Sequence, residues 1–299
     1  MQATIQADMS VNSSNSSLYL LFYHCFDSRT AVFIYTTYLN IKILLGLPLS
    51  ILIFYLGHRQ WRRQSSTTRT SHSDVFTYHL AAIELTTVVA FIFFFCGSYT
   101  DLPVMKKVGF YVGNMGFPGE MFFHLLTCVE RYLAVVHPVT YLGLRQSGGV
   151  RIRNISVVCV WLLCFGWTGV LALYDPHFPS IPFSCILVFT LFVVSPCSLS
   201  VLCVLIRPGP GKVGGGEERV DQSKQRAFHT VVAITGVLWL WFVGLLVCVA
   251  LEASLLLSYS DGCVVAVSAI WLNLPSSLVL PLLFLHRAGK RLCCRYSSD

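Results

Sequence analysis

The chain alternates long apolar runs with short polar and basic segments. After a polar start come seven apolar stretches, each about long enough to cross a ~30 Å hydrocarbon core as a helix of ~20 residues. The stretches are 31–56, 75–100, 103–136, 152–174, 183–206, 227–256 and 262–286. The pattern predicts an all-α membrane protein in one domain, with an N-terminal segment 1–30, a seven-helix bundle 31–286 and a tail 287–299.

Two of the stretches are irregular. The seventh carries Pro275 and Pro281, where we expect a kink or local unwinding, because proline removes a backbone donor. The third is the least regular, and its first half is interrupted by Gly109, Gly113, Gly116, Pro118 and Gly119. Membrane helices tolerate such residues when neighbouring groups satisfy the freed backbone.

Composition supports a membrane protein and excludes other classes. Charged residues make up 12% of the chain, against roughly a quarter in soluble domains, and hydrophobic residues make up 55%. The net charge of +7 falls in short clusters between apolar runs, so we expect no nucleic-acid partner. Most of the 12 cysteines lie inside apolar runs, where cysteine acts as a small hydrophobe. Metal-ligand spacing, a nucleophile elbow and a phosphate loop are absent from the sequence, which therefore predicts no enzyme.

The positions of lysine and arginine predict the orientation. They gather in the loops after the first, third and fifth stretches and in the tail, and cytoplasmic loops carry such an excess. The N-terminus is therefore expected outside and the C-terminus inside. Asn12 and Asn15, both in glycosylation sequons, would face the glycosylating compartment, whereas the sequon at Asn154 would lie in the cytoplasm and stay bare.

A charged motif ends the third stretch. The segment LTCVERYLAVVHP (126–138) places Glu130, Arg131 and Tyr132 at the polar end of an apolar run. An arginine at a helix centre costs roughly 2.5–3.5 kcal/mol on insertion scales, so the pair belongs at a membrane boundary or against partners. The motif resembles the Glu/Asp-Arg-Tyr motif of rhodopsin-like (class A) G-protein-coupled receptors. Pro138 would then open the second cytoplasmic loop.

The resemblance extends along the whole chain. Trp161 and Pro196 stand where that family has a constant tryptophan and a kink proline, and Trp239 is similar to its rotamer-switch tryptophan. Pro281 and Phe284 match the proline and aromatic residue of its Asn/Asp-Pro-x-x-Tyr/Phe motif. The resemblance implies a plasma-membrane receptor that passes an extracellular signal to a heterotrimeric G protein.

Several positions depart from the family pattern. Trp241 stands in place of the proline after the switch tryptophan, Leu280 in place of the polar residue before Pro281, and Ser50 in place of an asparagine. The chain therefore resembles a divergent member. An alternative is a receptor-shaped protein without independent signalling, such as a partner or chaperone for another receptor.

The disulfide of the family also has no direct counterpart. Lys106 stands where its cysteine at the top of the third span is expected. The resemblance leaves three pairings open, namely Cys25–Cys185, Cys25–Cys96 and Cys185–Cys263.

Two acids lie inside apolar stretches. Glu84 stands where the family has a buried aspartate that helps to bind sodium. Glu120 stands in place of a serine that lines the same sodium pocket, and Ser276 and Ser277 match other residues of that pocket. An intramembrane acid indicates function by default. We hypothesise a polar core sensitive to protons or to a sodium ion, with His124, one turn from Glu120, as the partner of the proton. The alternatives are neutral acids that hydrogen-bond across helices, or a small proton or ion transporter.

A conformational switch is expected at the cytoplasmic end. Asp221 lies five helical turns before Trp239 on roughly the same face, so it could pair with Arg131 in a resting state. Outward movement of the sixth span would then expose Arg131 to a G-protein helix. The alternative is that Asp221 is a solvated loop charge.

The ligand is not specified by the sequence. Gly113 stands at the position of the amine-binding aspartate of aminergic receptors, which argues against a monoamine. Lys106 and Lys107 could attract an anionic group, or could extend to lipid headgroups. By depth alone, the candidate pocket walls are Tyr99, Asn114, Phe242 and Trp271.

The tail has the composition of a membrane-associated helix. The segment His286–Tyr296 is short and basic and contains Cys293 and Cys294. These features are typical of an amphipathic helix on the lipids of the inner leaflet with palmitoylated cysteines, although unmodified cysteines fit as well.

Overall fold

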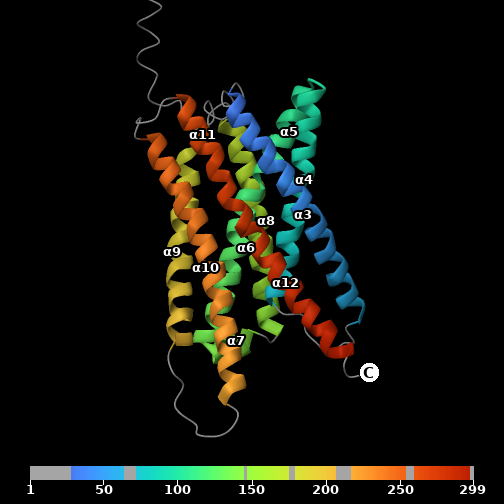
Figure 1. The fold of residues 1–299 in the computed structure, drawn as a ribbon, viewed down its shortest axis with the longest axis vertical. Helices are drawn as coiled ribbons and strands as arrows, with labels where there is room; N and C mark the ends of the chain where they lie inside the picture. The colour runs from blue at the N-terminus through green and yellow to red at the C-terminus, as the bar shows by residue number, and fades with distance from the viewer. Residues whose placement is uncertain are drawn as a thin grey trace, which may run out of the picture.

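The computed structural model describes residues 28–63, 72–144, 147–174, 179–206, 217–253 and 259–296. These ranges are helical almost throughout and contain no strand, and Figure 1 shows the helices arranged as an elongated bundle around α6. The elements are α3 (Arg29–Arg63), α4 (His72–Tyr99), α5 (Pro103–Asn114), α6 (Gly116–Val136), α7 (Pro138–Leu144), α8 (Ser147–Tyr174), α9 (Ser180–Ile206), α10 (Glu217–Ala253), α11 (Tyr259–Ala269), the 3₁₀ turn η1 (Ile270–Leu272) and α12 (Asn273–Tyr296).

The chain is an all-α, multi-pass membrane protein. Among the described residues, 6 helical segments are long and apolar enough to cross a membrane. They are Arg29–Arg59, Asp74–Tyr99, Gly148–Tyr174, Ser180–Ile206, Val232–Leu251 and Asp261–Leu285. Each coincides with one of the apolar stretches of the sequence, and the stretch without such a segment is the third.

The third stretch, the least regular in the sequence, is divided into two helices within the interrupted region. α5 ends at Asn114 and α6 begins at Gly116, with Met115 between them as a turn whose N–H bonds the Val112 carbonyl at 3.1 Å. Pro118 has no N–H to offer the Asn114 carbonyl, so the regular ladder cannot continue here. α5 has 12 residues, too few to span alone.

The last stretch is locally unwound just before Pro275, one of the two prolines at which irregularity was expected. The 3₁₀ turn η1 separates α11 from α12 and ends three residues before Pro275, which cannot donate to the Trp271 carbonyl. Helix α12 then runs through Pro281 and continues to Tyr296. The tail is therefore helical, but as an extension of α12 rather than as a separate helix.

Glycines bring α4 and α5 into close contact. A Cβ on Gly109 would meet the backbone N of Phe94, and would lie 2.7 Å from the Ala90 carbonyl oxygen. A Cβ on Gly97 would lie 2.5 Å from the backbone N of Lys106. The two backbones therefore pack directly against each other, a common use of small residues between membrane helices.

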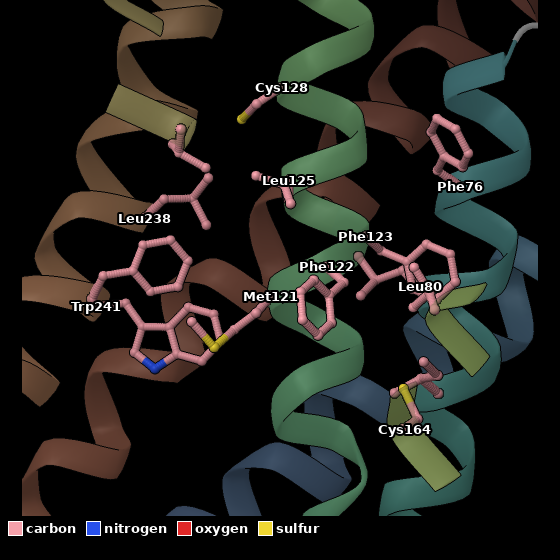
Figure 2. Close-up of a cluster of buried hydrophobic side chains, with 14 of the residues drawn as sticks. Phe76, Leu80, Met121, Phe122, Phe123, Leu125, Cys128, Cys164, Leu238 and Trp241 are labelled. Atoms are coloured by element: carbon pink, nitrogen blue, oxygen red, sulfur yellow. The ribbon is translucent and has the colours of Figure 1, made fainter. Parts of the chain in front are cut away.

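The main apolar core surrounds α6. Figure 2 shows Phe123 of α6 beside Leu80 of α4, and Met121 beside Trp241 of α10. Phe123, Leu80 and Met121 are fully buried, and Trp241 is 1% exposed. α6 therefore connects two halves of the bundle through its opposite faces.

The cysteines rule out every pairing considered above. Cys96 and Cys185 are free, and each of the three pairings required one of them. Cys263 is disulfide-bonded, to a partner outside the described residues.

Candidate functional site

A lysine and two glutamates meet inside the bundle. Lys42 Nζ donates to Glu120 Oε1 at 2.9 Å and lies 3.3 Å from Glu84 Oε2. All three side chains are at most 5% exposed. We call Lys42, Glu84 and Glu120 the triad.

Three apolar helices supply the triad. Lys42 projects from α3, Glu84 from α4 and Glu120 from α6, so the charges join segments far apart in the sequence. Burying these charges is costly, and their mutual attraction offsets that cost only with close geometry. The contacts of about 3 Å supply it.

The triad carries unequal charge. One ammonium faces two carboxyl groups, so full ionisation would leave a surplus negative charge in a region of low dielectric. Two carboxyls near one site resist double ionisation, and one of them would hold a proton unless another cation supplies the balance.

The triad corrects the predicted polar core. Glu84 and Glu120 lie together as predicted, but their partner is Lys42 rather than His124. Both ring nitrogens of His124, which is fully buried, have no hydrogen-bond partner among the described residues. The cation beside the acids in this structure is therefore a side chain of the protein.

The two predicted serines bond within their own helix. Ser276 Oγ donates to the Asn273 carbonyl at 2.7 Å and to Asn273 Oδ1 at 3.0 Å. Ser277 Oγ donates to the Leu274 carbonyl at 3.1 Å. Both are buried, but neither hydroxyl takes part in the triad.

A cavity of about 170 Å³ opens beside the triad. Lys42 and Glu120 form part of its wall. All of the described helices except α7, and the turn η1, contribute at least one residue to it. Much of the wall is aromatic, including Tyr38, Phe117 and Trp241. The cavity thus lies where the helices converge, with charged groups on one side and aromatic rings around it.

Only part of the predicted pocket lies at this cavity. Asn114 lines it, whereas Phe242 packs behind Trp241, with ring centroids 5.0 Å apart. Trp271 contacts the cavity residue Tyr38 edge-on at 6.0 Å without lining the cavity itself. The other predicted positions lie away from it: Tyr99 is 96% exposed, and Lys106 and Lys107 belong to the first turns of α5.

The charged motif lies at the other end of α6. Arg131 is half-buried and lines a small cavity of about 20 Å³ between α6, α9 and α10. Glu130 is buried and accepts a hydrogen bond from the Tyr141 hydroxyl of α7 at 3.2 Å. Tyr132 and His137 are joined by a hydrogen bond of 3.1 Å between the hydroxyl and Nε2. The motif thus anchors the short helix α7.

The predicted switch tryptophan faces outward. Trp239 is 41% exposed, whereas Trp241, two residues on, is 1% exposed and lies 6.2 Å from the Phe117 ring. The buried tryptophan of α10 is therefore Trp241, and the assignment of Trp239 to an interior switch was wrong. Pro281 is buried, and Phe284 packs edge-on against Tyr78 at 5.5 Å.

Lys42 was missed by the sequence analysis, although a signal existed. It is a charged residue in the middle of the apolar stretch 31–56, and the rule that drew attention to the acids applies equally to a lysine.

For some predicted positions the structure describes no side chain. Asn12 and Asn15 are not among the described residues, nor are the side chains of Asp221, Cys293 and Cys294.

Neither protein-family models nor curated proteins provide a relative of this chain. A scan against protein-family models finds no match, and a search of curated proteins finds none either.

Proposed function

We propose that the chain is a seven-helix receptor of the plasma membrane that passes a ligand signal to a heterotrimeric G protein. The observation that supports this function best is the pair of sites on α6. Glu120 lines the larger cavity, and Arg131, about three turns along the same helix, lines the small cavity against α9 and α10.

The broken helix supplies the seventh crossing in this proposal. α5 and α6 follow one another with a single residue between them and together span 103–136. The six candidate segments plus this pair give an odd number of crossings, with the N-terminus outside and Arg131 on the cytoplasmic side.

Signalling would require α10 to move. Trp241 touches the ligand cavity, and Ile234 and Thr235, about two turns away on α10, line the small cavity with Arg131. A displacement of α10 at Trp241 would therefore widen the space at Arg131 and admit a helix of the G protein.

The test is a G-protein activation assay without added ligand. We expect basal nucleotide exchange in membranes containing the wild-type chain, and its loss in Arg131→Ala at equal surface expression. Arg153→Ala, which removes another basic residue at the predicted cytoplasmic side, serves as the control. Equal exchange in the wild type, Arg131→Ala and empty membranes would support the receptor-shaped alternative without signalling.

A second candidate is a proton or ion transporter, favoured by the triad and by His124, whose ring nitrogens have no hydrogen-bond partner among the residues that the structure describes. Such a protein would conduct protons or exchange them for an ion across reconstituted vesicles. Loss of flux in Glu84→Gln would establish transport. Flux no higher than in empty vesicles would argue against the transporter, and the receptor proposal would then stand.

A further inference from the structure

The cavity next to the triad has the size of a small molecule. Its volume of about 170 Å³ is comparable with the roughly 150 Å³ engineered cavity that binds benzene. A ligand with one six-membered ring and a short chain fits these dimensions. Aromatic side chains such as Tyr38, Phe117 and Trp241 would contact the ring.

The charged side of the cavity favours a cation. One ammonium and two carboxyls leave the triad a negative surplus when all are ionised. An anionic ligand would add a third negative group around Lys42, which is already paired. A cationic ligand would bring the total to neutrality, and the aromatic faces would add cation–π attraction.

Glu120 has an oxygen available for such a ligand. Its Oε1 accepts from Lys42, while Oε2 is buried and has no hydrogen-bond partner among the described residues. The Thr87 hydroxyl, also at the cavity wall, is likewise without a partner in that part of the chain. An ammonium has three donors and no acceptor, so it matches the unsatisfied acceptors on this wall.

The helix break does not reverse this preference. The C-terminal end of α5 and the N-terminal end of α6 both reach the cavity, at Asn114 and Gly116. Their partial charges, about −0.5 and +0.5, are opposite and adjacent, so they largely cancel. The full charge of a carboxylate outweighs the remainder.

We propose that the cavity binds small protonated amines that carry one apolar ring, with the ammonium on Glu120 Oε2 and the ring against Tyr38, Phe117 and Trp241. This reverses the expectation from Gly113, which argued against a monoamine ligand. An acid is missing at that position, but the structure provides one about two turns deeper on the far side of the helix break. The proposal assigns a ligand class to the cavity of the proposed receptor and rests on that function only for its signalling.

The test uses purified protein in lipid nanodiscs and three matched probes. They are 2-phenylethylamine, 2-phenylethanol and 3-phenylpropanoate, which share a phenylethyl body and end in a cation, a neutral donor and an anion. Quenching of tryptophan fluorescence reports binding, with empty nanodiscs as the partition control. We expect the amine to bind at least ten-fold more tightly than the alcohol, and the carboxylate to bind most weakly.

Three variants test the position of the charge. Glu120→Gln should reduce the preference for the amine over the alcohol to less than three-fold while retaining binding of the alcohol. Glu130→Gln, on the same helix about three turns away, should keep the wild-type preference. Lys42→Met removes the competing ammonium and should bind the amine more tightly than the wild type, a gain that misfolding cannot imitate.

The outcomes are distinct. Equal or tighter binding of the alcohol, or tightest binding of the carboxylate, overturns the proposal, and so does an unchanged amine preference in Glu120→Gln together with no gain in Lys42→Met. Amine binding without G-protein activation would overturn the receptor function and keep the ligand class. Basal activation without amine binding would overturn the ligand class and keep the receptor function.

Discussion

At the scale of single residues, Lys42 decides how the buried acids behave. Its ammonium makes close contacts to carboxyl groups from two other helices, so the two acids share one positively charged partner. Removing one partner of a buried pair costs about 3–5 kcal/mol in soluble proteins, because it leaves an uncompensated charge.

This gives a prediction for stability. Lys42→Met should lower the midpoint of thermal unfolding, and its effect should be smaller in a Glu120→Gln background, by an interaction energy of about 0.5–3 kcal/mol. A double-mutant cycle on purified protein measures this energy. Strictly additive effects of the two substitutions would contradict a direct interaction in the folded protein.

A second prediction concerns sodium. Exchanging sodium chloride for choline chloride at equal ionic strength should leave the unfolding midpoint of the wild type unchanged, because the Lys42 ammonium already contacts both carboxyl groups and a proton retained by one of them offsets the remaining charge. The Lys42→Met variant should be stabilised by sodium, since its two carboxyls have lost their cation. A sodium effect in the wild type that Glu84→Ala abolishes would instead restore the ion site expected from the sequence.

At the scale of elements, local chemistry explains where prediction worked and where it failed. Apolar length located the membrane helices, because backbone groups in lipid must bond within the segment. The same measure could not divide α5 from α6, although Gly113, Gly116 and Pro118 marked the irregular region, because apolar length does not show where a helix is interrupted. The helix α7 was missed for a related reason. It is short, and the Tyr141–Glu130 contact that joins it to α6 links residues in different elements.

The glycine contact between α4 and α5 yields a prediction at this scale. Gly109→Ala should lower the unfolding midpoint by several degrees, because the new methyl would meet the Phe94 and Ala90 backbone and force the helices apart. Gly169→Ala is the matched control, with nothing within 4 Å of the added Cβ. There the better helix propensity of alanine should leave stability equal or higher, by up to about 1 kcal/mol. Equal losses in both variants would show that the close contact between α4 and α5 is not the cause of the lower unfolding midpoint.

At the scale of the whole molecule, the sequence predicted the class of fold but not the contacts that build the site. Glu84 and Glu120 were predicted to meet because the family resemblance places both positions in one pocket. Their partner could not be derived, since it depends on how α3 is rotated against α4 and α6. The rotation of α10 caused the error at Trp239 and Trp241, because a stretch that is apolar on all sides carries little information about which face points inward.

Orientation is the prediction that belongs to this scale. Asn12→Gln and Asn15→Gln should each reduce the mass lost on deglycosylation of the full chain expressed in cells, and Asn154→Gln should not change it. Electrophoresis before and after treatment with a glycosidase measures the shift. A glycan on Asn154, or an epitope after Asp299 that antibody reaches on intact cells, would reverse the assignment of sides.

The turn at Met115 has a mechanical consequence. A continuous rod would transmit a push on its outer end directly to its inner end, whereas the regular hydrogen-bond ladder is interrupted at Met115 and α5 is packed directly against α4. Motion started at the outer surface would therefore be passed from α5 to α4 as well as along α6 to Arg131. A signal from the contents of the cavity would instead travel sideways to Trp241, and α10 would act as the lever arm.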